Sequence, residues 1–206
     1  MTEAVGAGIP ERRDRRADRH AATRREIVDA AWQLAREHGL AGWALRDVAE
    51  AVGMRAPSLY VYFASKNALY DAMFADGYAE LLTRAEQLEE AQAAAAPVDL
   101  VRAGASMFVD FCVEDPARLQ LLFLRTLPGF EPSPESYAPA QQVFGRMAVA
   151  LAAAGRGTAE HVDLWTALLT GLATQQVSND PGGDRWRRLV DPAVDMFLAA
   201  HLLPSP

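Results

Sequence analysis

The sequence predicts an all-α fold of about nine helices. Apolar residues recur at intervals of three and four through most of the 206 residues, which is the spacing of one face of an α-helix. No segment of useful length alternates apolar and polar residues as a half-buried strand does. Half of the residues are apolar, enough for a folded core. The periodic segments are divided by residues typical of helix ends, at Gly39, Gly53, Pro97, Pro116 and Pro181.

The charge of the chain is unevenly distributed. The formal net charge is −7, but residues 1–70 carry eleven Lys/Arg against nine Asp/Glu, and residues 71–206 carry nine against eighteen. This favours a local basic contact face on an acidic body over a protein that simply coats nucleic acid. Cys112 is the only cysteine, which excludes an internal disulfide. We expect no membrane-spanning segment and no secretory signal, and hence a cytoplasmic protein.

The first 21 residues are predicted to form a flexible basic arm. They include the run ERRDRRADRH and offer almost no apolar side chain for burial. Seven arginines lie between Arg12 and Arg25. An arm of this kind either follows DNA phosphates or stays in solvent, and the sequence leaves both open. The first helix is expected to begin at Thr23, where Glu26 completes a capping box, and to end before Gly39.

Residues 22–70 are predicted to form a helix-turn-helix domain. A short second helix ends at Gly53, in the position expected of a left-handed residue. Pro57 and Ser58 begin a very short third helix, and Ser65 caps a long fourth one. Two helices joined around a glycine are typical of a DNA-reading motif. The same pattern also fits a helical interaction module that docks a partner protein without binding DNA.

Several side chains around the third helix are of types that contact DNA. Arg46 has the planar fork that pairs bidentately with guanine. Ser58, Tyr60 and Tyr62 supply hydroxyl groups, and Lys66, the only lysine, can reach a phosphate as a point charge. Their order within one short stretch favours the DNA-binding interpretation.

This stretch resembles the N-terminal domain of the TetR family of transcriptional regulators. The resemblance covers roughly residues 23–70. It rests on Leu45-Arg46-Asp47-Val48-Ala49, Gly53, Ser58-Leu59-Tyr60, Tyr62-Phe63 and Ser65-Lys66 with Leu69. It implies a homodimer that binds a palindromic operator in double-stranded DNA, usually as a repressor that a small ligand releases. A regulator that activates, or one that has no ligand, stays an alternative.

The resemblance also implies roles for individual residues. The positions that face bases are Arg46, Ala56, Pro57 and Tyr60 or Val61. The positions that hold phosphates are Ser58, Tyr62 and Lys66. Ala44 stands where the family often has a Ser or Thr, so a phosphate contact from that hydroxyl is not expected here.

Residues 71–206 are predicted to form a helical ligand-binding and dimerisation domain. The candidates for lining a ligand cavity are apolar residues at helical spacing and polar residues among them: Phe108, Phe111, Phe123, Phe144, Met147, His161, Trp165 and Gln175. This set favours an apolar or aromatic effector. Gln175 and its neighbour Gln176 cannot both face one way, so at least one is expected at the surface.

The helix predicted over residues 158–179 is apolar on two sides. Such a helix is shared between two packing surfaces, here the domain core and a second copy of the chain. With the last helix it would form an intersubunit four-helix bundle. The candidates for this dimer interface are Leu164, Leu168, Gly171, Val194, Phe197 and Leu198.

The sequence does not predict an enzyme. It has no metal-spaced cluster of His and Cys, no glycine-rich phosphate loop and no nucleophile elbow. The four histidines are scattered along the chain. We therefore expect no catalytic residue, no metal ligand and no cofactor.

Overall fold

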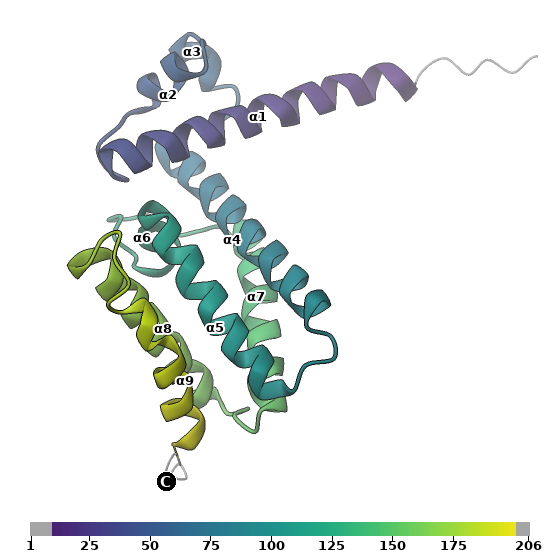
Figure 1. Ribbon diagram of the computed structural model, residues 1–206. Helices are drawn as coiled ribbons and strands as arrows, with labels where there is room; N and C mark the ends of the chain where they lie inside the picture. The colour runs from purple at the N-terminus through teal and green to yellow at the C-terminus, as the bar shows by residue number, and fades with distance from the viewer. Residues whose placement is uncertain (1–9, 201–206) are drawn as a thin grey trace, which may run out of the picture. The chain divides into compact units, whose positions relative to one another are not determined.

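The computed structural model describes residues 10–200, with side chains from Arg15 onward. Within that range the chain forms nine α-helices, one short 3-10 helix and no strand (Figure 1). The predicted all-α fold is thereby confirmed. The chain divides into two compact units, the first ending at Leu69 and the second beginning at Tyr70.

The first unit contains three helices and the start of a fourth. These are α1 (Pro10–His38), α2 (Leu45–Ala51), α3 (Ala56–Leu59) and the first turn of α4 (Lys66–Ala91). Helix α2 contacts both α1 and α3. The side chains that form the core of this unit include Ile27, Ala31, Trp32, Trp43, Val48, Leu59, Phe63 and Leu69.

Gly53 makes the turn between α2 and α3. Its φ of +66° lies in the left-handed region, which residues with a Cβ atom rarely adopt. Its N–H donates to the carbonyl of Glu50, and the next N–H, of Met54, donates to that of Ala49. The role expected of Gly53 as the residue that ends the helix is confirmed.

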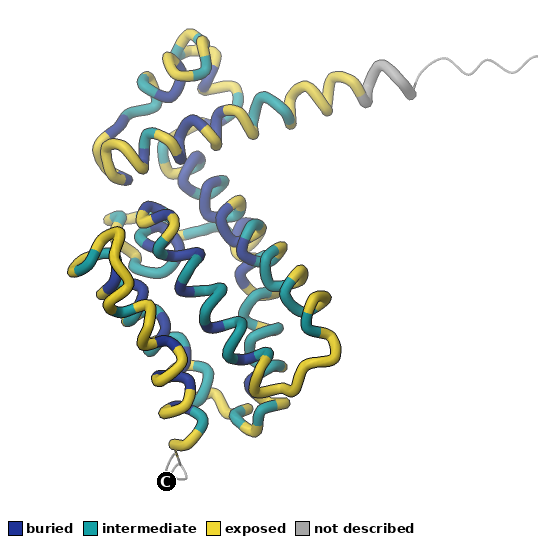
Figure 2. Tube along the Cα trace, viewed as in Figure 1, coloured by how far each residue is buried: buried dark blue, intermediate teal, exposed yellow. Residues whose placement is uncertain are grey.

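Helix α1 begins at Pro10, not at Thr23. Residues 10–21, predicted as part of a flexible arm, are therefore helical, whereas residues 1–9 lie outside the described part of the chain. The reason is local: proline is favoured in the first turn of a helix, and the Arg and Ala residues that follow are strong helix formers. The stretch from Arg15 to Ala21 is exposed throughout (Figure 2), so packing does not account for its helix.

The second unit holds the rest of α4 and the remaining helices. They are α5 (Pro97–Glu114), α6 (Pro116–Phe123), α7 (Pro134–Ala153), α8 (Ala159–Asn179), the 3-10 helix η1 (Arg187–Leu189) and α9 (Val190–Ala199). Helix α5 is central and contacts α6, α7, α8 and α9. The core consists of Val101, Ala105, Val109, Leu151, Trp165, Leu169, Val190, Val194 and Phe197.

Helices α6 and α9 of this unit each have a proline in their first turn. Helix α6 begins at Pro116 and ends at Phe123, and Arg125 then adopts a φ of +43°. Helix α9 begins at Val190. Pro192 thus lies in the first helical turn, where its missing N–H needs no partner within the helix.

Candidate nucleic-acid interface and ligand cavity

Helix α3 and the turn after it present two large side chains to solvent. Leu59 and Phe63 are buried and hold this segment against the core of the first unit. Between them, Tyr60 is 55% exposed and Val61 is 76% exposed. Burial at both ends therefore fixes a short surface segment whose middle residues face outward.

Arg46 extends from α2 with a side chain that is 82% exposed. Its Nε donates to Oδ1 of Asp47 at 3.3 Å. The other carboxylate oxygen, Oδ2, accepts the backbone N–H of Ala44 at 2.7 Å. This bond is the main reason why the pKa of Asp47 lies below its usual value. Asp47 thus helps to cap α2, where the Ala44 side chain has no hydroxyl to do so.

Lys66 is held by the loop that joins α1 to α2. Its ammonium group donates to the carbonyl oxygens of Trp43 and Ala41 and lies 4.1 Å from the centre of the Trp43 ring. Removal from water lowers the pKa of Lys66, and the negative charge of Asp47 opposes that shift. The ammonium group of Lys66 therefore binds the protein itself, a contact that the phosphate role expected from the sequence does not explain.

Tyr62 is supported by α1. The rings of His20 and Tyr62 are stacked, with centroids 4.8 Å apart. Arg24 donates from its guanidinium to the carbonyl oxygen of Tyr62 at 2.8 Å and lies over the Phe63 ring. Sequence reasoning did not single out His20 or Arg24. The run of arginines before residue 25 was the only signal for them.

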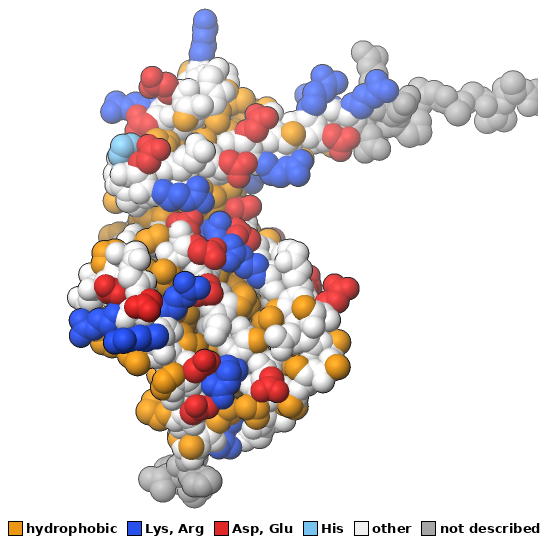
Figure 3. All heavy atoms as spheres, viewed as in Figure 1, with side chains coloured by type: hydrophobic (Ala, Val, Ile, Leu, Met, Phe, Trp, Pro, Cys, Tyr) orange, Lys and Arg blue, Asp and Glu red, His pale blue; other side chains and the backbone are white. Residues whose placement is uncertain are grey.

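The eight residues predicted to contact DNA all lie in the first unit, on α2 and on the segment from α3 to the start of α4. Five of them are exposed: Arg46, Pro57, Ser58, Tyr60 and Val61. Three are half-buried: Ala56, Tyr62 and Lys66. Arginine side chains also project from the exposed start of α1 (Figure 3).

Residues 27–73, which form most of this unit, match the family model described as bacterial regulatory proteins of the tetR family. The chain belongs to the tetR family of bacterial regulatory proteins. It is a DNA-binding transcriptional regulator and not an enzyme. The family resemblance drawn from the sequence is confirmed.

Known proteins are similar to this chain over most of its length. The HTH-type transcriptional regulator Rv1816 of Mycobacterium tuberculosis is 29% identical over 86% of this chain and 76% of its own. The solved structure of the putative regulatory protein SCO4313 has a TM-score of 0.73 at 19% identity, covering 89% and 98% of the two chains. FadR from Bacillus subtilis, solved in complex with stearoyl-CoA, has a TM-score of 0.63 at 16% identity, covering 84% and 97%. At these identities the two structures show a shared fold.

The second unit of this TetR-family regulator contains a cavity of about 110 Å³. Helices α4, α5, α7 and α8 and the last residue of α6 line it, almost entirely with apolar side chains. Two of its lining residues are charged, Glu89 and Arg146, and they form an ion pair with each other. The cavity therefore offers an unfilled apolar space and little polar recognition.

Five of the eight residues predicted to bind a ligand line this cavity: Phe108, Phe123, Phe144, Met147 and Trp165. Three others do not. The His161 ring accepts from the N-cap residue Thr158 at the start of α8. The Gln175 side chain is exposed and accepts from Asn179. Its neighbour Gln176 is the buried one and accepts the backbone N–H groups of Trp186 and Arg187.

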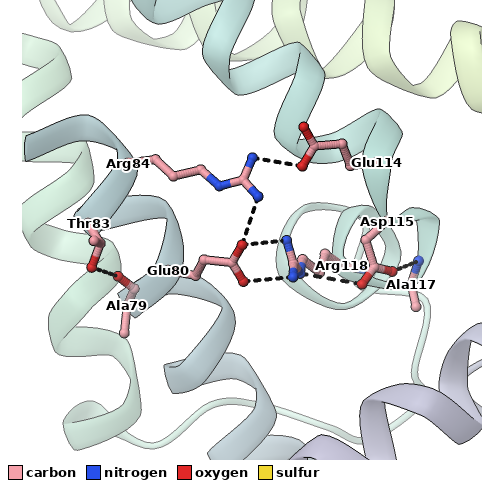
Figure 4. A network of polar contacts seen from close by, with 8 residues as sticks. All are labelled: Ala79, Glu80, Thr83, Arg84, Glu114, Asp115, Ala117 and Arg118. Atoms are coloured by element: carbon pink, nitrogen blue, oxygen red, sulfur yellow. Dashed lines mark hydrogen bonds and ion pairs between the residues drawn. The ribbon is translucent and has the colours of Figure 1, made fainter. Parts of the chain in front are cut away.

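Phe111 is the third residue outside the cavity. It is fully buried, and the guanidinium groups of Arg84 and Arg118 lie about 5 Å from its ring centre, at 5.1 and 5.0 Å. Both arginines bind the carboxylate of Glu80, and Arg84 also binds Glu114 at 2.8 Å (Figure 4). Phe111 thus packs beneath an ionic network that joins α4, α5 and α6.

The start of α6 completes that network. Asp115 is buried and accepts the backbone N–H groups of Ala117 and Arg118 at the N-terminus of α6. Its second oxygen lies 3.4 Å from Nε of Arg118 (Figure 4). The corner between α5 and α6 is therefore tied to α4 through charged groups.

The outward face of α8 carries part of the predicted dimer interface. Leu164 is 47% exposed, Gly171 is exposed and Leu168 is half-buried. On α9, by contrast, Val194 and Phe197 are buried in the core of their own unit, where α9 packs on α5 and α8. Leu198, like Leu168, is half-buried and packs against that core. The dimer interface itself stays a prediction. Met196 is the large apolar residue that α9 exposes.

Within the described residues, no group of three or more His, Cys, Asp or Glu side chains is arranged to hold a metal ion. No helix there is long and apolar enough to span a bilayer.

Proposed function

We propose that this regulator is a homodimeric repressor that binds a palindromic operator and leaves it when a small apolar or aromatic ligand enters the second unit. The observation that supports this is the continuity of α4. Its first turn belongs to the first unit, and further along the same helix Tyr78, Leu81 and Leu88 line the cavity. A ligand that favours another position of α4 acts on both units through one helix.

The first unit reads the operator in this proposal. Arg46, Ala56, Pro57 and Tyr60 or Val61 face bases, and Ser58, Tyr62 and Lys66 hold phosphates. The exposure of Arg46, Tyr60 and Val61 supports the first set, since side chains that read bases must enter a groove. The contacts of Tyr62 with His20 and Arg24 support the second, because a phosphate contact gains from a side chain held in place.

The exposed start of α1 extends this phosphate contact. Arg16, His20 and Arg24 are spaced by four residues and so lie along one helix face. Two of them touch Tyr62, and Arg16 comes one turn further toward the N-terminus. Arg16 and the neighbouring Arg19 are both exposed. We include these two arginines among the groups that neutralise phosphates beside the reading helix.

The second unit joins two copies of the chain through the outward face of α8. Leu164, Leu168 and Gly171 form its apolar centre, and Met196 of α9 extends it. A twofold dimer would place two reading heads on consecutive major grooves, about 34 Å apart. The cytoplasm, where the operator lies, is then its place of action.

Two observations support the binding of a ligand in this cavity. An apolar space of this size resembles cavities that take up small hydrocarbons. A solved neighbour of the same fold holds stearoyl-CoA, which makes compounds with apolar chains the first candidates. The alternatives are an activator and a regulator without a ligand. They differ from the proposed repressor in how transcription of the target gene responds to loss of the protein or to a ligand.

The test measures operator and ligand together. After selection of an operator from random DNA, fluorescence anisotropy gives its affinity with and without a bound compound. We expect a ligand to weaken operator binding and the operator to weaken ligand binding by the same factor. In a reporter strain, deletion of the gene should raise transcription. An operator complex that persists with bound ligand contradicts ligand release, and a fall in transcription on deletion identifies an activator.

A further inference from the structure

A second cavity lies beside the first, across a wall of aromatic rings. It has a volume of about 230 Å³ and is lined by residues of α4 and α6, by the segment that joins α6 to α7, and by residues of α7 and α8. Four residues line both cavities: Tyr78, Phe123, Phe144 and Thr166. The two spaces, which we term the apolar chamber (110 Å³) and the polar chamber (230 Å³), are therefore neighbours with one shared wall.

The charged and hydroxyl groups that line the apolar chamber bind other groups of the protein. Its charged lining residues, Glu89 and Arg146, bind each other, and Arg146 also binds Glu86 at 2.7 Å. The hydroxyl of Thr166 donates to the carbonyl of Val162 in its own helix. Because two carboxylates face one guanidinium at that end, an anionic group is disfavoured there. The apolar chamber thus suits an uncharged hydrocarbon.

The polar chamber is different, because polar side chains form part of its lining. The Thr170 hydroxyl is buried and has no hydrogen-bond partner in the described part of the chain. Of the other polar lining residues, Gln120 is half-buried, and Arg125 and Tyr137 are exposed to solvent. A buried hydroxyl without a partner is costly, and a ligand that supplies an acceptor removes that cost.

Arg125 is held in this place by backbone geometry. Its φ of +43° is the only positive value for a non-glycine residue among those described. It follows directly on Leu124, the C-cap of α6, whose last residue Phe123 belongs to the shared wall. Non-glycine residues in this region are strained, and such strain concentrates at ligand-binding segments.

The shared wall consists mainly of aromatic rings in contact with one another. Phe123 lies 5.5 Å from Tyr78 and 5.0 Å from Phe108, centroid to centroid. Phe123 ends α6 and is half-buried, so a change of its rotamer joins the two chambers without breaking a backbone hydrogen bond inside a helix.

We propose that the two chambers form one site for an anionic amphiphile. Its hydrocarbon chain occupies the apolar chamber, and its carboxylate or phosphate group occupies the polar chamber, where it binds Arg125 and accepts from Thr170, Gln120 and Tyr137. This inference rests on the proposed ligand-responsive function and adds to it the charge of the ligand and the position of its head group. Phe123 separates chain from head in the unliganded protein.

The experiment compares ligands of equal chain length on the full-length protein by isothermal titration calorimetry. The probes are octanoate, octyl phosphate, 1-octanol and octylamine, with acetate as the head group alone. We expect octanoate or octyl phosphate to bind about tenfold or more tightly than 1-octanol, since a hydrogen-bonded charge contributes that much. The better of the two anions identifies the head group. Acetate should not bind measurably.

Variants separate the two chambers. Arg125→Gln should remove the preference for the anion over 1-octanol and leave the affinity for 1-octanol unchanged, and Thr170→Val should weaken the anion alone. Arg188→Gln, an exposed arginine outside both chambers, is the matched control. Gly104 lines the apolar chamber and has open space for a Cβ, so Gly104→Leu should fill it and abolish binding of all four octyl compounds while the protein stays folded.

Equal binding of octanoate, octyl phosphate and 1-octanol, or an anion preference that survives Arg125→Gln, overturns the proposal. Binding of octylamine in preference to the anions does so as well. These results do not bear on the proposed ligand release, which is tested separately by measuring operator binding. If an octyl compound of any charge binds tightly and the operator complex stays intact, the proposed ligand release is contradicted.

Discussion

The ammonium group of Lys66 lies 4.1 Å from the centre of the Trp43 ring and donates to the carbonyl oxygens of Trp43 and Ala41. The only lysine of the chain thereby fastens the first turn of α4 to the loop between α1 and α2. The position that the family pattern assigns to a phosphate contact is also a structural clamp inside the reading unit.

Lys66→Met keeps most of the side chain and removes the charge and its hydrogen bonds. We expect the free energy of unfolding to fall by about 2 kcal/mol, because hydrogen bonds from a charged donor and a cation–π contact are lost together. Urea titration measures this. Arg188→Met is the control and should leave the stability unchanged.

The same variant tests the phosphate contact. If Lys66 also neutralises one phosphate, the slope of log K against log salt for operator binding falls by about one in Lys66→Met. A lower stability with an unchanged slope would assign Lys66 to the clamp alone.

Arg46→Ala should relax operator specificity at one base pair. Its exposed guanidinium has only Asp47 as a described partner, so it is available to a guanine edge. We expect a loss of about 1–3 kcal/mol on the preferred operator and almost none on operators altered at that base pair. Anisotropy titrations with single-base variants of the operator measure it. A uniform loss on all sequences would make Arg46 a phosphate contact.

Arg16→Gln combined with Arg19→Gln should reduce the salt slope of operator binding by about two, one for each phosphate that is no longer neutralised. The loss should be the same for specific and random DNA, because phosphate contacts carry no sequence information. Helix content by circular dichroism is the control, since glutamine is a good helix former. An unchanged slope would mean that the start of α1 is solvated.

Asp47 makes stability depend on pH in acid. Its pKa in the folded protein is below 3.8, chiefly because the Ala44 N–H binds the carboxylate. Between the folded and unfolded pKa values the folded state binds fewer protons, so this contribution is complete above the unfolded value and lost as the pH falls through the folded one. Asp47→Asn should therefore be less stable at neutral pH and lose less on acidification below about pH 4.

Thermal unfolding between neutral pH and acid measures this difference. Asp163→Asn, which changes an exposed aspartate of α8, is the matched control. A pH profile of Asp47→Asn that parallels the wild type would show that other carboxylates carry the acid sensitivity.

Leu164→Arg should convert the proposed dimer into monomers without unfolding them. Leu164 is 47% exposed on the outward face of α8, so a charge there is tolerated by the single chain and repels its copy across a twofold axis. Analytical ultracentrifugation gives the molar mass. Val149→Arg, at a 71% exposed position on α7, is the control. A dimer that survives Leu164→Arg would place the interface elsewhere.

Some of the structure follows from short-range rules. Gly53 ends α2 and Pro57 lies in the first turn of α3 because these residues act through their own backbone angles. The helix at the start of α1 also follows a local rule, because the same arginines that indicated an arm are good helix formers.

The interior of the second unit depends on contacts between distant segments. The helical period identified Phe108 and Phe111 equally well, yet the first lines a cavity and the second lies between two arginines of α4 and α6. In the same way, Val194 was as good an interface candidate as Leu164, although it is fully buried. Periodicity shows which residues lie on an apolar helix face, but it does not show which other segment packs against that face.

By itself, then, the sequence determined the helical fold and the DNA-reading unit, because capping, turns and motif spacing operate within a few residues of chain. Only the tertiary structure decided that Lys66 clamps the α1–α2 loop, that α9 turns Phe197 inward, and that Arg125 and Thr170 border a common chamber. Each of these is a contact between side chains or carbonyls from different elements. Its partner is fixed by how the helices pack and not by local spacing.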